Sequence, residues 1–465
     1  MTVQEVFAGL LAVGIAMLVG KAVRMRSGWL QRLYVPSSVV AGLLALLAGP
    51  EVLGRWWGAR PDGLLGATVL EVWSAMPAVL INVVFAALFL GKQIPSPRRI
   101  WELAGPQVAF GQTLAWGQYV VGLTLALVVL VPLFGMNPLV GTLIEIGFEG
   151  GHGTSAGLRG TFEDVGFEEG ADLALGLATI GLVAGVLIGT GLVAWAAHRG
   201  EIEPEGADDA QGPDDRERLA ELDEREPRSE GGGASIDPLS VHVGFVALAV
   251  AVGWVLQRAL VVLEQATWGA DDGLELMTNI PLFPLAMLGG VAVQVVVDHS
   301  PRPDLIDRDL MNRISGFSLD VVIVTALATL SLQVIGDALV PFLLLAAAGI
   351  AWNVGAFLLL APRMIPRDWF PRGSGDFGQS MGMTVTGLLL MRMADPHNRS
   401  GAFEAFGYKQ LLFEPVVGGG LFTAASVPLV AAFGPGWILA LCAVLTLGWA
   451  ALGLFLFGGP GRSAT

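Results

Sequence analysis

Long apolar runs constrain the fold of this 465-residue chain more than any other feature of its sequence. Each run is roughly 18 to 25 residues long, which is the length a helix needs to cross about 30 Å of hydrocarbon. Charged residues make up only 14% of the chain, whereas soluble domains carry about 25%. The pattern predicts an all-α polytopic membrane protein with eleven crossings, at 5–22, 34–50, 69–91, 106–133, 172–197, 239–263, 279–297, 314–333, 337–361, 408–431 and 435–457.

A polar segment in the middle of the chain carries more than half of the net charge of −15. Between Arg199 and Glu230 there are thirteen acidic residues and five arginines, a local balance of −8. Such a segment buries too little apolar surface to offset its conformational entropy. We therefore expect 198–236 to be an acidic linker that serves as a solvated spacer, with a regulatory docking segment as the alternative.

The basic residues predict the orientation in the membrane, because Lys and Arg concentrate in cytoplasmic loops. With the N-terminus outside, the 198–236 linker and the C-terminus lie in the cytoplasm together with most of the basic loops. The outside loops then keep only three basic residues, Arg55, Arg60 and Arg159. We expect a multi-pass protein of the bacterial inner (cell) membrane in this orientation.

Two further apolar stretches, 139–160 and 373–393, are interrupted by glycines. If each enters the membrane and returns on the same side, the chain divides into halves of five crossings, 1–197 and 237–431, each with one re-entrant loop. The odd number gives the halves opposite orientations, which is the inverted-repeat plan of secondary transporters. Residues 432–465 are then an extra C-terminal helix and tail.

The first loop combines glycines with hydroxyl groups in the sequence EGGHGTSAG. Glycine permits close approach of bare backbone N–H and C=O groups to a ligand at membrane depth. Such groups suit a desolvated Na⁺ and a substrate carboxylate. The candidate substrate-binding residues here are Gly150, Gly151, His152, Gly153, Thr154 and Ser155, and the alternative is a packing seam of small residues.

The second loop repeats this composition in FGQSMGMTVTG. Its candidate substrate-binding residues are Gln379, Ser380 and Thr384, and Arg392 is a candidate carboxylate clamp. For Arg392 the favoured interpretation is only the cytoplasmic end of the loop. Asp376 is either a cation ligand or an N-cap at the loop entrance.

Several of these motifs resemble the sodium/glutamate symporter family. The resemblance rests on GGHGT in the first loop, ATIGLVAGVLIG at 178–189, YVPSSVVAGLLALL at 34–47 and FGQSMGMTVTG at 377–387, with a looser fit of EPVVGGGLF at 414–422. It implies a homodimeric carrier of the elevator type, in which both loops form the substrate and Na⁺ sites of a mobile domain. It also implies Na⁺ as the coupling ion and glutamate, or a similar small acidic solute, as cargo.

The chain departs from the family pattern at several ionisable residues. Glu145 and Glu149 stand where the family has hydroxyl residues, and Asp320, Lys409 and Glu414 lie in or near apolar runs. An ionisable residue at membrane depth is by default a functional hypothesis, although Lys409 or Glu414 can also snorkel to the interface. The Na⁺ candidates are Glu149, Thr154, Asp320, Asp376, Thr384 and Thr386.

Glu149 leaves the coupling mechanism open, because a carboxylate beside the loop repels an anionic solute unless it binds a cation or a proton. The first hypothesis is Na⁺ symport, with Glu149 binding the coupling ion or titrating during transport. The second is proton coupling through Glu149, Glu145 or Asp320, with another organic acid as solute. A channel or a non-transporting scaffold is the third.

Other classes of function find no support in the sequence. There is no nucleotide-binding loop, no metal-ligand cluster and no catalytic triad around Ser155, and the single Cys442 excludes an intrachain disulfide. For His152 a structural hydrogen bond is favoured over proton coupling. We therefore expect a membrane protein in contact with lipid, neither an enzyme nor a nucleic-acid binder, and without an organic cofactor.

Overall fold

The computed structural model describes residues 2–32, 35–56, 62–92, 96–202, 237–267, 277–278, 280–302, 305–397 and 399–458. Throughout these residues the regular structure is helical, and no β-strand occurs in them. Most of the predicted acidic linker lies outside the described residues, at 203–236.

Nine of the described helices or helix pairs are long and apolar enough to cross a membrane. They span Val3–Arg26, Ser37–Gly54, Ala67–Ala87, Ile100–Phe134, Gly170–Arg199, Pro238–Ala266, Arg308–Ala328, Leu339–Met364 and Pro435–Phe457. Each corresponds to one of the eleven predicted crossings. The predicted crossing at 279–297 is a shorter helix, Leu282–Asp298, and the one at 408–431 is interrupted.

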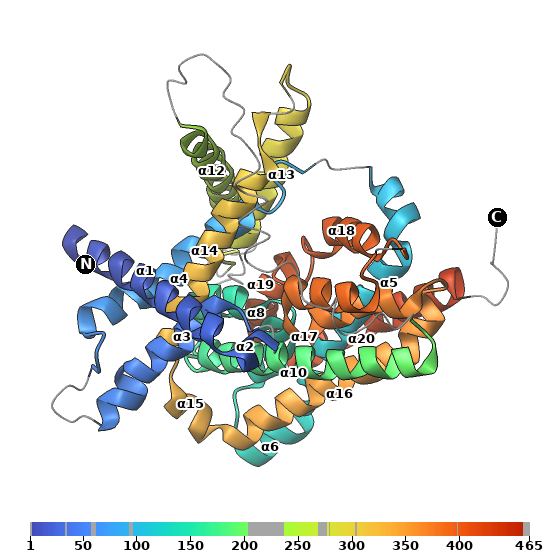
Figure 1. Ribbon diagram of the computed structural model, residues 1–465, viewed down its shortest axis with the longest axis horizontal. Coiled ribbons are helices and arrows are strands. Elements are labelled where there is room, and N and C mark those ends of the chain that lie inside the picture. Colours follow the sequence, from blue (N-terminus) through green and yellow to red (C-terminus); the bar gives the residue numbers. More distant parts are fainter. Residues whose placement is uncertain are drawn as a thin grey trace.

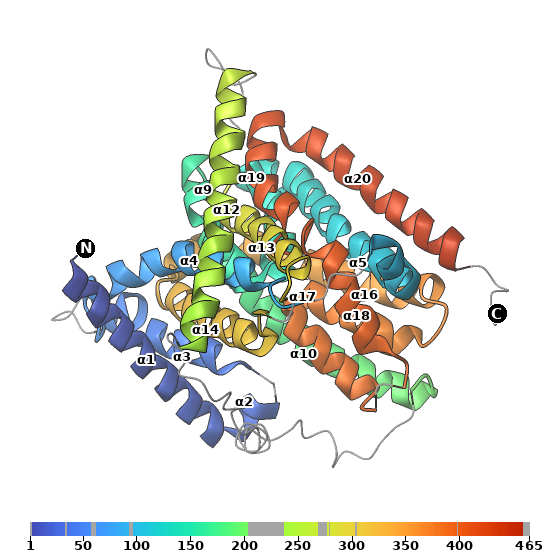
Figure 2. The same ribbon diagram turned by 90° about the horizontal axis from the view of Figure 1, so that it is seen from above.

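The helices form two groups that lie side by side (Figures 1 and 2). Bundle A contains helices from the start of each predicted half: α1 (Val3–Arg26), α3 (Ser37–Ala48), α4 (Ala67–Ala87), α12 (Pro238–Ala266), α13 (Leu282–Asp298) and α14 (Arg308–Ala328). Within bundle A, α12 packs along α13, and α14 packs against both α3 and α4.

Bundle B contains the remaining long helices (Figure 1). They are α5 (Pro97–Leu125), α10 (Gly170–Arg199), α16 (Leu339–Met364), α17 (Trp369–Ala394), α18 (Ala402–Phe413), α19 (Leu421–Phe433) and α20 (Pro435–Leu452). Here α10 packs on α17, and α5 packs on α16, α18 and α20. The largest cluster of buried apolar side chains lies mainly in this bundle.

Short helical pieces connect or extend these elements. They are α2 (Gly28–Arg32), η1 (Pro50–Gly54), η2 (Ala126–Leu130), α6 (Val131–Phe134), η3 (Pro138–Thr142), α7 (Leu143–Phe148), α8 (Gly151–Gly157), α9 (Arg159–Asp164), α15 (Leu332–Asp337) and η5 (Gly453–Phe457). The predicted loop 139–160 is thus a chain of short helices. Both α7 and α8 pack on α10, and α8 also contacts α4 and α14 of bundle A.

Side-chain caps explain where several spans begin. The backbone N–H of Glu5 donates to Oγ1 of Thr2, and the Glu5 carboxylate accepts from the Thr2 backbone, which is a capping box. Asp237 accepts from the backbone of Leu239 at the start of α12, at 2.8 Å. These caps satisfy backbone donors that have no partner inside the helix.

Small residues allow the helices to approach closely. A Cβ atom added to Gly289 of α13 would lie 2.1 Å from the carbonyl oxygen of Ala249 in α12. Likewise, a Cβ atom on Gly181 of α10 would lie 2.3 Å from the carbonyl oxygen of Met381 in α17. Such contacts are the usual packing of helices in lipid, where backbone approach replaces hydrophobic burial as the source of attraction.

The prediction of one continuous span at 408–431 was wrong. Helix α18 ends at Phe413 and α19 begins at Leu421, so residues 414–420 form a break. Gly418 and Gly419 have φ angles of +71° and +98°, which are favourable only for glycine. Pro415 adds a residue without a backbone donor, and together these residues end the helix inside an apolar run.

Candidate functional site

The two glycine-rich segments predicted as loops meet at their breaks. The first break lies between α7 and α8, at Glu149 and Gly150, and is followed by Gly151 with φ +68°. The second break interrupts α17 at Gly382 and Met383. A Cβ atom on Gly151 would lie 2.6 Å from Cγ and Sδ of Met383, so the two breaks are in direct contact.

Met383 holds an unusual backbone conformation at this contact. Its φ angle is +77°, one of two positive values among the described non-glycine residues. A long side chain in this region of backbone space costs roughly 1–3 kcal/mol, and such residues cluster at functional sites. The strain therefore marks the second break as a place where the surrounding structure enforces a special geometry.

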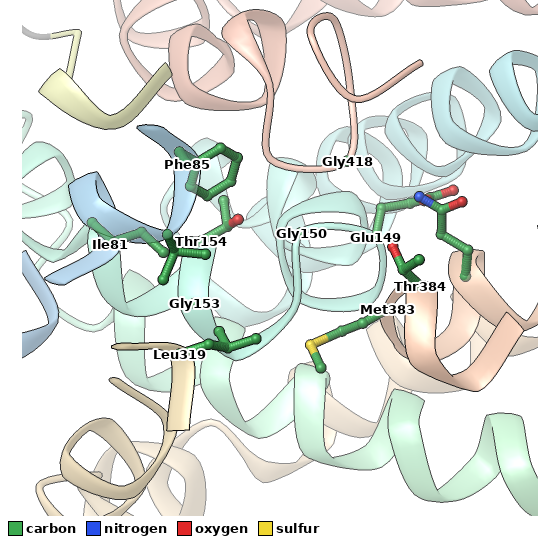
Figure 3. Close-up of a pocket in the computed structure, with 12 residues that line it drawn as sticks. Ile81, Phe85, Glu149, Gly150, Gly153, Thr154, Leu319, Met383, Thr384 and Gly418 are labelled. Carbon is green, nitrogen blue, oxygen red and sulfur yellow. The ribbon is translucent and has the colours of Figure 1, made fainter. Parts of the chain in front are cut away.

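A cavity of about 110 Å³ lies beside these breaks (Figure 3). Bundle A contributes its apolar wall through Ile81, Val84 and Phe85 of α4 and Leu319 of α14. The opposite wall comes from the broken segments: Glu149, Gly150, Gly153, Thr154, Gln379, Met383, Thr384 and Gly418. The cavity therefore lies between the two bundles and is lined by all three breaks.

Glu149 brings a carboxylate to this cavity, as Figure 3 shows. Its side chain is only 3% exposed. The hydroxyl of Ser380 donates to Oε1 at 2.5 Å, while Oε2 has no hydrogen-bond partner among the described residues. A buried oxygen of this kind is costly unless a ligand pairs with it.

Thr154 presents a second unpaired oxygen to the cavity. The side chain is 1% exposed, and Oγ1 has no partner within the described part of the chain. Thr154 and Glu149 lie on either side of Gly150 in Figure 3. Both are oxygen donors of the type that hard cations prefer.

The third break, residues 414–420, is held against the first segment by Glu145. The carboxylate accepts from the backbone N–H of Gly418 at 2.9 Å, from the Thr423 hydroxyl at 2.8 Å and from the Tyr119 hydroxyl at 2.5 Å. Both oxygens of this fully buried side chain are thus occupied. Glu145 fixes the break in place and leaves no oxygen open to the cavity.

Amide side chains hold the second break. The carbonyl oxygen of Ser380 lies just before the break and accepts from Nδ2 of Asn353 at 2.7 Å and from Nε2 of Gln118 at 2.9 Å. Asn353 belongs to α16 and Gln118 to α5. These two helices therefore satisfy a carbonyl group that the interrupted helix leaves unpaired.

A buried ion pair lies behind the cavity. Nζ of Lys409 in α18 is 2.8 Å from Oδ1 of Asp376 in α17, and both side chains are 0% exposed. The same ammonium donates to Oε1 of Gln379 at 2.8 Å. Lys409 therefore does not snorkel to the interface. The interpretation of Asp376 as an N-cap was wrong, because α17 begins earlier, at Trp369.

The remaining candidate site residues do not line the cavity. Nε2 of His152 lies 3.0 Å from Oγ1 of Thr179, which agrees with the favoured structural role. The hydroxyls of Ser155 and Thr386 donate to backbone carbonyls of their own segments, at 2.8 and 2.7 Å. Asp320 and Arg392 are exposed and do not line the cavity.

The sequence also matches a known protein family. A model of the sodium/glutamate symporter family matches residues 63–394. This chain belongs to the sodium/glutamate symporter family. The match includes both predicted loops, whereas Lys409 and the third break lie beyond its end.

Two curated relatives carry the same family name. The sodium/glutamate symporters of Escherichia coli (strain K12) and Shigella flexneri are each 29% identical to this chain over 212 residues. The alignment covers 44% of this chain and 48% of each relative, so it spans about half the length of the curated relatives.

Some site residues of this family member escaped sequence reasoning. The three consecutive glycines at 418–420 were a visible signal of a third break, but they were assigned to a continuous span. The sequence marks Lys409 only as an ionisable residue in or near an apolar run. No signal identified Asn353, Gln118 and Tyr119 as supports, because a polar side chain in a span does not reveal its partner on another helix.

Proposed function

We propose that this protein is a secondary active transporter that couples Na⁺ to the uptake of glutamate or a similar small acidic solute. The observation that carries the proposal is the unpaired carboxylate oxygen of Glu149 in a cavity between three helix breaks. Broken helices at membrane depth are the usual site of substrate and ion binding in secondary transporters. Membership of the sodium/glutamate symporter family supports the same conclusion.

Na⁺ binds to Glu149 and Thr154 in this proposal. Both present buried oxygens without partners, and a cation there neutralises the carboxylate. Thr384, which also lines the cavity, is a further oxygen ligand. Asp320 and Thr386 do not belong to the proposed ion site, since the first is exposed and the second is bonded to Gly382 at 2.7 Å.

The acidic solute occupies the rest of the cavity. The backbone of Gly150 and Gly153 and the side chains of Gln379 and Thr384 provide its polar contacts. The negative charge of Glu149 repels a solute carboxylate until Na⁺ is bound. The proposal therefore predicts that Na⁺ binds first and that the solute follows.

Alternating access follows from the position of the cavity. One wall belongs to bundle A, and the other is formed by α17 of bundle B and by the α7–α8 segment, which packs on α10 of bundle B. Movement of bundle B together with this segment against bundle A would expose the site to opposite sides. The packing pattern supports two related halves, 1–197 and 237–431. Helix α3 contacts α14 as α4 contacts α13, and α1 contacts α3 as α12 contacts α13.

The membrane arrangement completes the proposal. The apolar helices and the family indicate a multi-pass membrane protein. We assign it to the bacterial inner membrane as a homodimer, with the N-terminus outside and the 198–236 linker and C-terminus in the cytoplasm. The loop charges support this orientation. Cysteine labelling of 198–236 from outside intact cells would contradict it.

Uptake into proteoliposomes tests the coupling. An imposed Na⁺ gradient should drive accumulation of labelled glutamate, and an imposed pH gradient alone should not.

We expect Glu149→Gln to raise the half-saturating Na⁺ concentration by roughly tenfold or more, since each ~1.4 kcal/mol of lost attraction corresponds to tenfold. Glu163→Gln, on the exposed surface of α9, is the matched control. Transport by Glu149→Gln with unchanged Na⁺ dependence and pH profile would remove the proposed role.

Proton coupling is the second candidate, and Glu149 is the carboxylate that fits it best. Glu145 has both oxygens occupied and Asp320 is exposed, which leaves Glu149 as the carboxylate that faces the cavity. Accumulation driven by a pH gradient without Na⁺ would favour this candidate. Counterflow exchange of labelled solute separates both carriers from a channel or a scaffold, because neither of these trans-stimulates.

A further inference from the structure

Lys409 is surrounded by the kinds of group that bind a monovalent cation. Its ammonium lies 2.8 Å from a carboxylate oxygen of Asp376 and 2.8 Å from the amide oxygen of Gln379. The ring of Phe413 covers a third side, with its centroid 3.7 Å from Nζ. Carboxylate and carbonyl oxygens are the ligands of hard cations, and an aromatic face adds attraction for a positive charge.

Two of these ligands come from one face of the helix that carries the second break. Asp376 and Gln379 are three residues apart in the first half of α17, so both side chains lie on the same side of the helix. The space around the ammonium is filled. A Cβ atom on Gly111 of α5 would lie 2.8 Å from Nζ, so a free cation cannot enter without displacing the lysine.

The tethered charge also acts on the cavity through Gln379. The amide oxygen of Gln379 accepts from Lys409 and, at 3.0 Å, from Nε2 of Gln410. With the oxygen occupied by two donors, the amide nitrogen is the group left to face the cavity that Gln379 lines. Lys409 thereby orients a hydrogen-bond donor toward the position of the solute.

The charges near the site distinguish two carboxylates. Lys409 attracts Asp376, Glu149 and Glu414, but it contacts only Asp376. Oε2 of Glu149 stays without a partner among the described residues. Oδ2 of Asp376 also lacks a hydrogen-bond partner in the described part of the chain, but Asp376 has a cation in contact with its other oxygen. Glu149 has no such counter-ion and is open to a free cation.

We infer that Lys409 is a tethered cation that permanently occupies the ion position formed by Asp376 and Gln379, so that free Na⁺ binds only at Glu149. The role of Lys409 in transport rests on the proposed Na⁺ coupling. Whether the lysine occupies the position formed by Asp376 and Gln379 can be tested separately. The inference assigns Asp376 to the lysine, although its sequence context made it a Na⁺ candidate.

Equilibrium binding of ²²Na⁺ to the purified full chain tests this inference without any solute. Lys409→Ala empties the position and should add one Na⁺ per chain relative to the unmodified protein. Asp376→Asn with Lys409 retained should leave the number unchanged. The double variant Asp376→Asn/Lys409→Ala should return to the original number, because the added ion needs the carboxylate.

Several outcomes would overturn the inference. Loss of one bound Na⁺ in Asp376→Asn would show that Asp376 already binds the ion, and an extra ion that persists in the double variant would place it elsewhere. Lys409→Ala should be more stable in Na⁺ than in choline. If its stability is equally low in both salts while the double variant folds, Na⁺ does not take the place of the ammonium, and the inference fails. If neither Lys409→Ala nor the double variant folds, the number of Na⁺ ions bound by Asp376→Asn decides. An unchanged number supports the inference, and the loss of one ion overturns it.

The proposed function and this inference fail in different ways. An unmodified protein that binds no Na⁺ would defeat Na⁺ coupling, yet a gain of one ion by Lys409→Ala would still support the tethered cation. Conversely, a Na⁺ count that falls only in Glu149→Gln, with no gain in Lys409→Ala, would retain Na⁺ coupling and remove the tethered cation.

Discussion

Gly151 shows how a single backbone conformation holds the two broken segments together. Its φ angle of +68° is available to glycine at no cost, and its missing side chain leaves room for Met383. Two constraints thus act on one residue: the turn that joins α7 to α8, and the contact with the second break. Glycines elsewhere in the segment satisfy at most one of them.

Replacement of this glycine should therefore be costly. Gly151→Ala places an L-residue in the left-handed region, which costs about 1–2 kcal/mol, and its Cβ would lie 2.6 Å from the Met383 side chain. We expect a lower melting temperature and reduced uptake. Gly160→Ala in α9 is the control, because its Cβ meets no atom within 4 Å. Equal behaviour of the two variants would contradict the contact between the breaks.

Residue identity in the site was only partly predictable from sequence. Glycines and hydroxyls grouped in one segment pointed to Gly150, Gly153 and Thr154, which line the cavity; their role as ligands stays a prediction. The pairing of Lys409 with Asp376 could not be predicted, because the two belong to different helices and no spacing rule connects them. Sequence pattern identifies polar residues at membrane depth, whereas their partners follow from how helices pack.

At the scale of elements, each break in a helix is stabilised by groups from other helices. The second break illustrates this: α5 and α16 supply the amides that bind the Ser380 carbonyl. The third break depends on Glu145 of α7 in the same way. A break of this kind needs a helix, a conformational signal and a distant donor or acceptor. The sequence showed the first two for 373–393. For 408–431 it showed them as well, through the glycines at 418–420, but the long apolar run favoured a continuous helix.

The support of the second break can be tested by removing one amide. Asn353→Leu deletes the donor that lies 2.7 Å from the Ser380 carbonyl oxygen. Because Gln118 still donates to this carbonyl, the loss is that of one buried hydrogen bond, about 0.5–1.5 kcal/mol, and we expect lower thermal stability and weaker uptake. Thr446→Val in α20 is the matched control, since that hydroxyl bonds only to the Cys442 carbonyl of its own helix, at 2.7 Å. An Asn353→Leu protein as stable and active as Thr446→Val would contradict the role of the amide.

At the scale of the whole molecule, the cavity lies at the boundary of two bundles. Composition and the length of the apolar runs predicted the helical class and most of the spans, because span length and hydropathy are local properties. The division into bundles was not predictable from those properties. It depends on which apolar faces pack together, and it determines that α8 of the site contacts α4 across the boundary.

A disulfide across this boundary tests whether transport requires relative movement. A Cβ atom on Gly157 of α8 would lie 3.5 Å from Cβ of Ile81 in α4, within the range of about 3.5–4.5 Å that disulfides adopt. In a background that lacks Cys442, the single native cysteine, Ile81→Cys/Gly157→Cys should lose uptake on oxidation and regain it on reduction. Labelled uptake before and after reduction measures the effect.

The control is a second disulfide inside one bundle. A Cβ atom on Gly373 of α17 would lie 3.2 Å from Cβ of Ala361 in α16, and both helices belong to bundle B. This distance is slightly shorter than disulfides adopt, so loss of both free thiols on oxidation is verified before uptake is measured. Oxidation of Ala361→Cys/Gly373→Cys should leave uptake unchanged, because the bundle moves as a unit in the proposed mechanism. Full uptake by the oxidised boundary pair would mean that the α4–α8 contact persists through the cycle. The site would then have to change access by local rearrangement of the breaks, with Met383 as the strained residue best placed to relax.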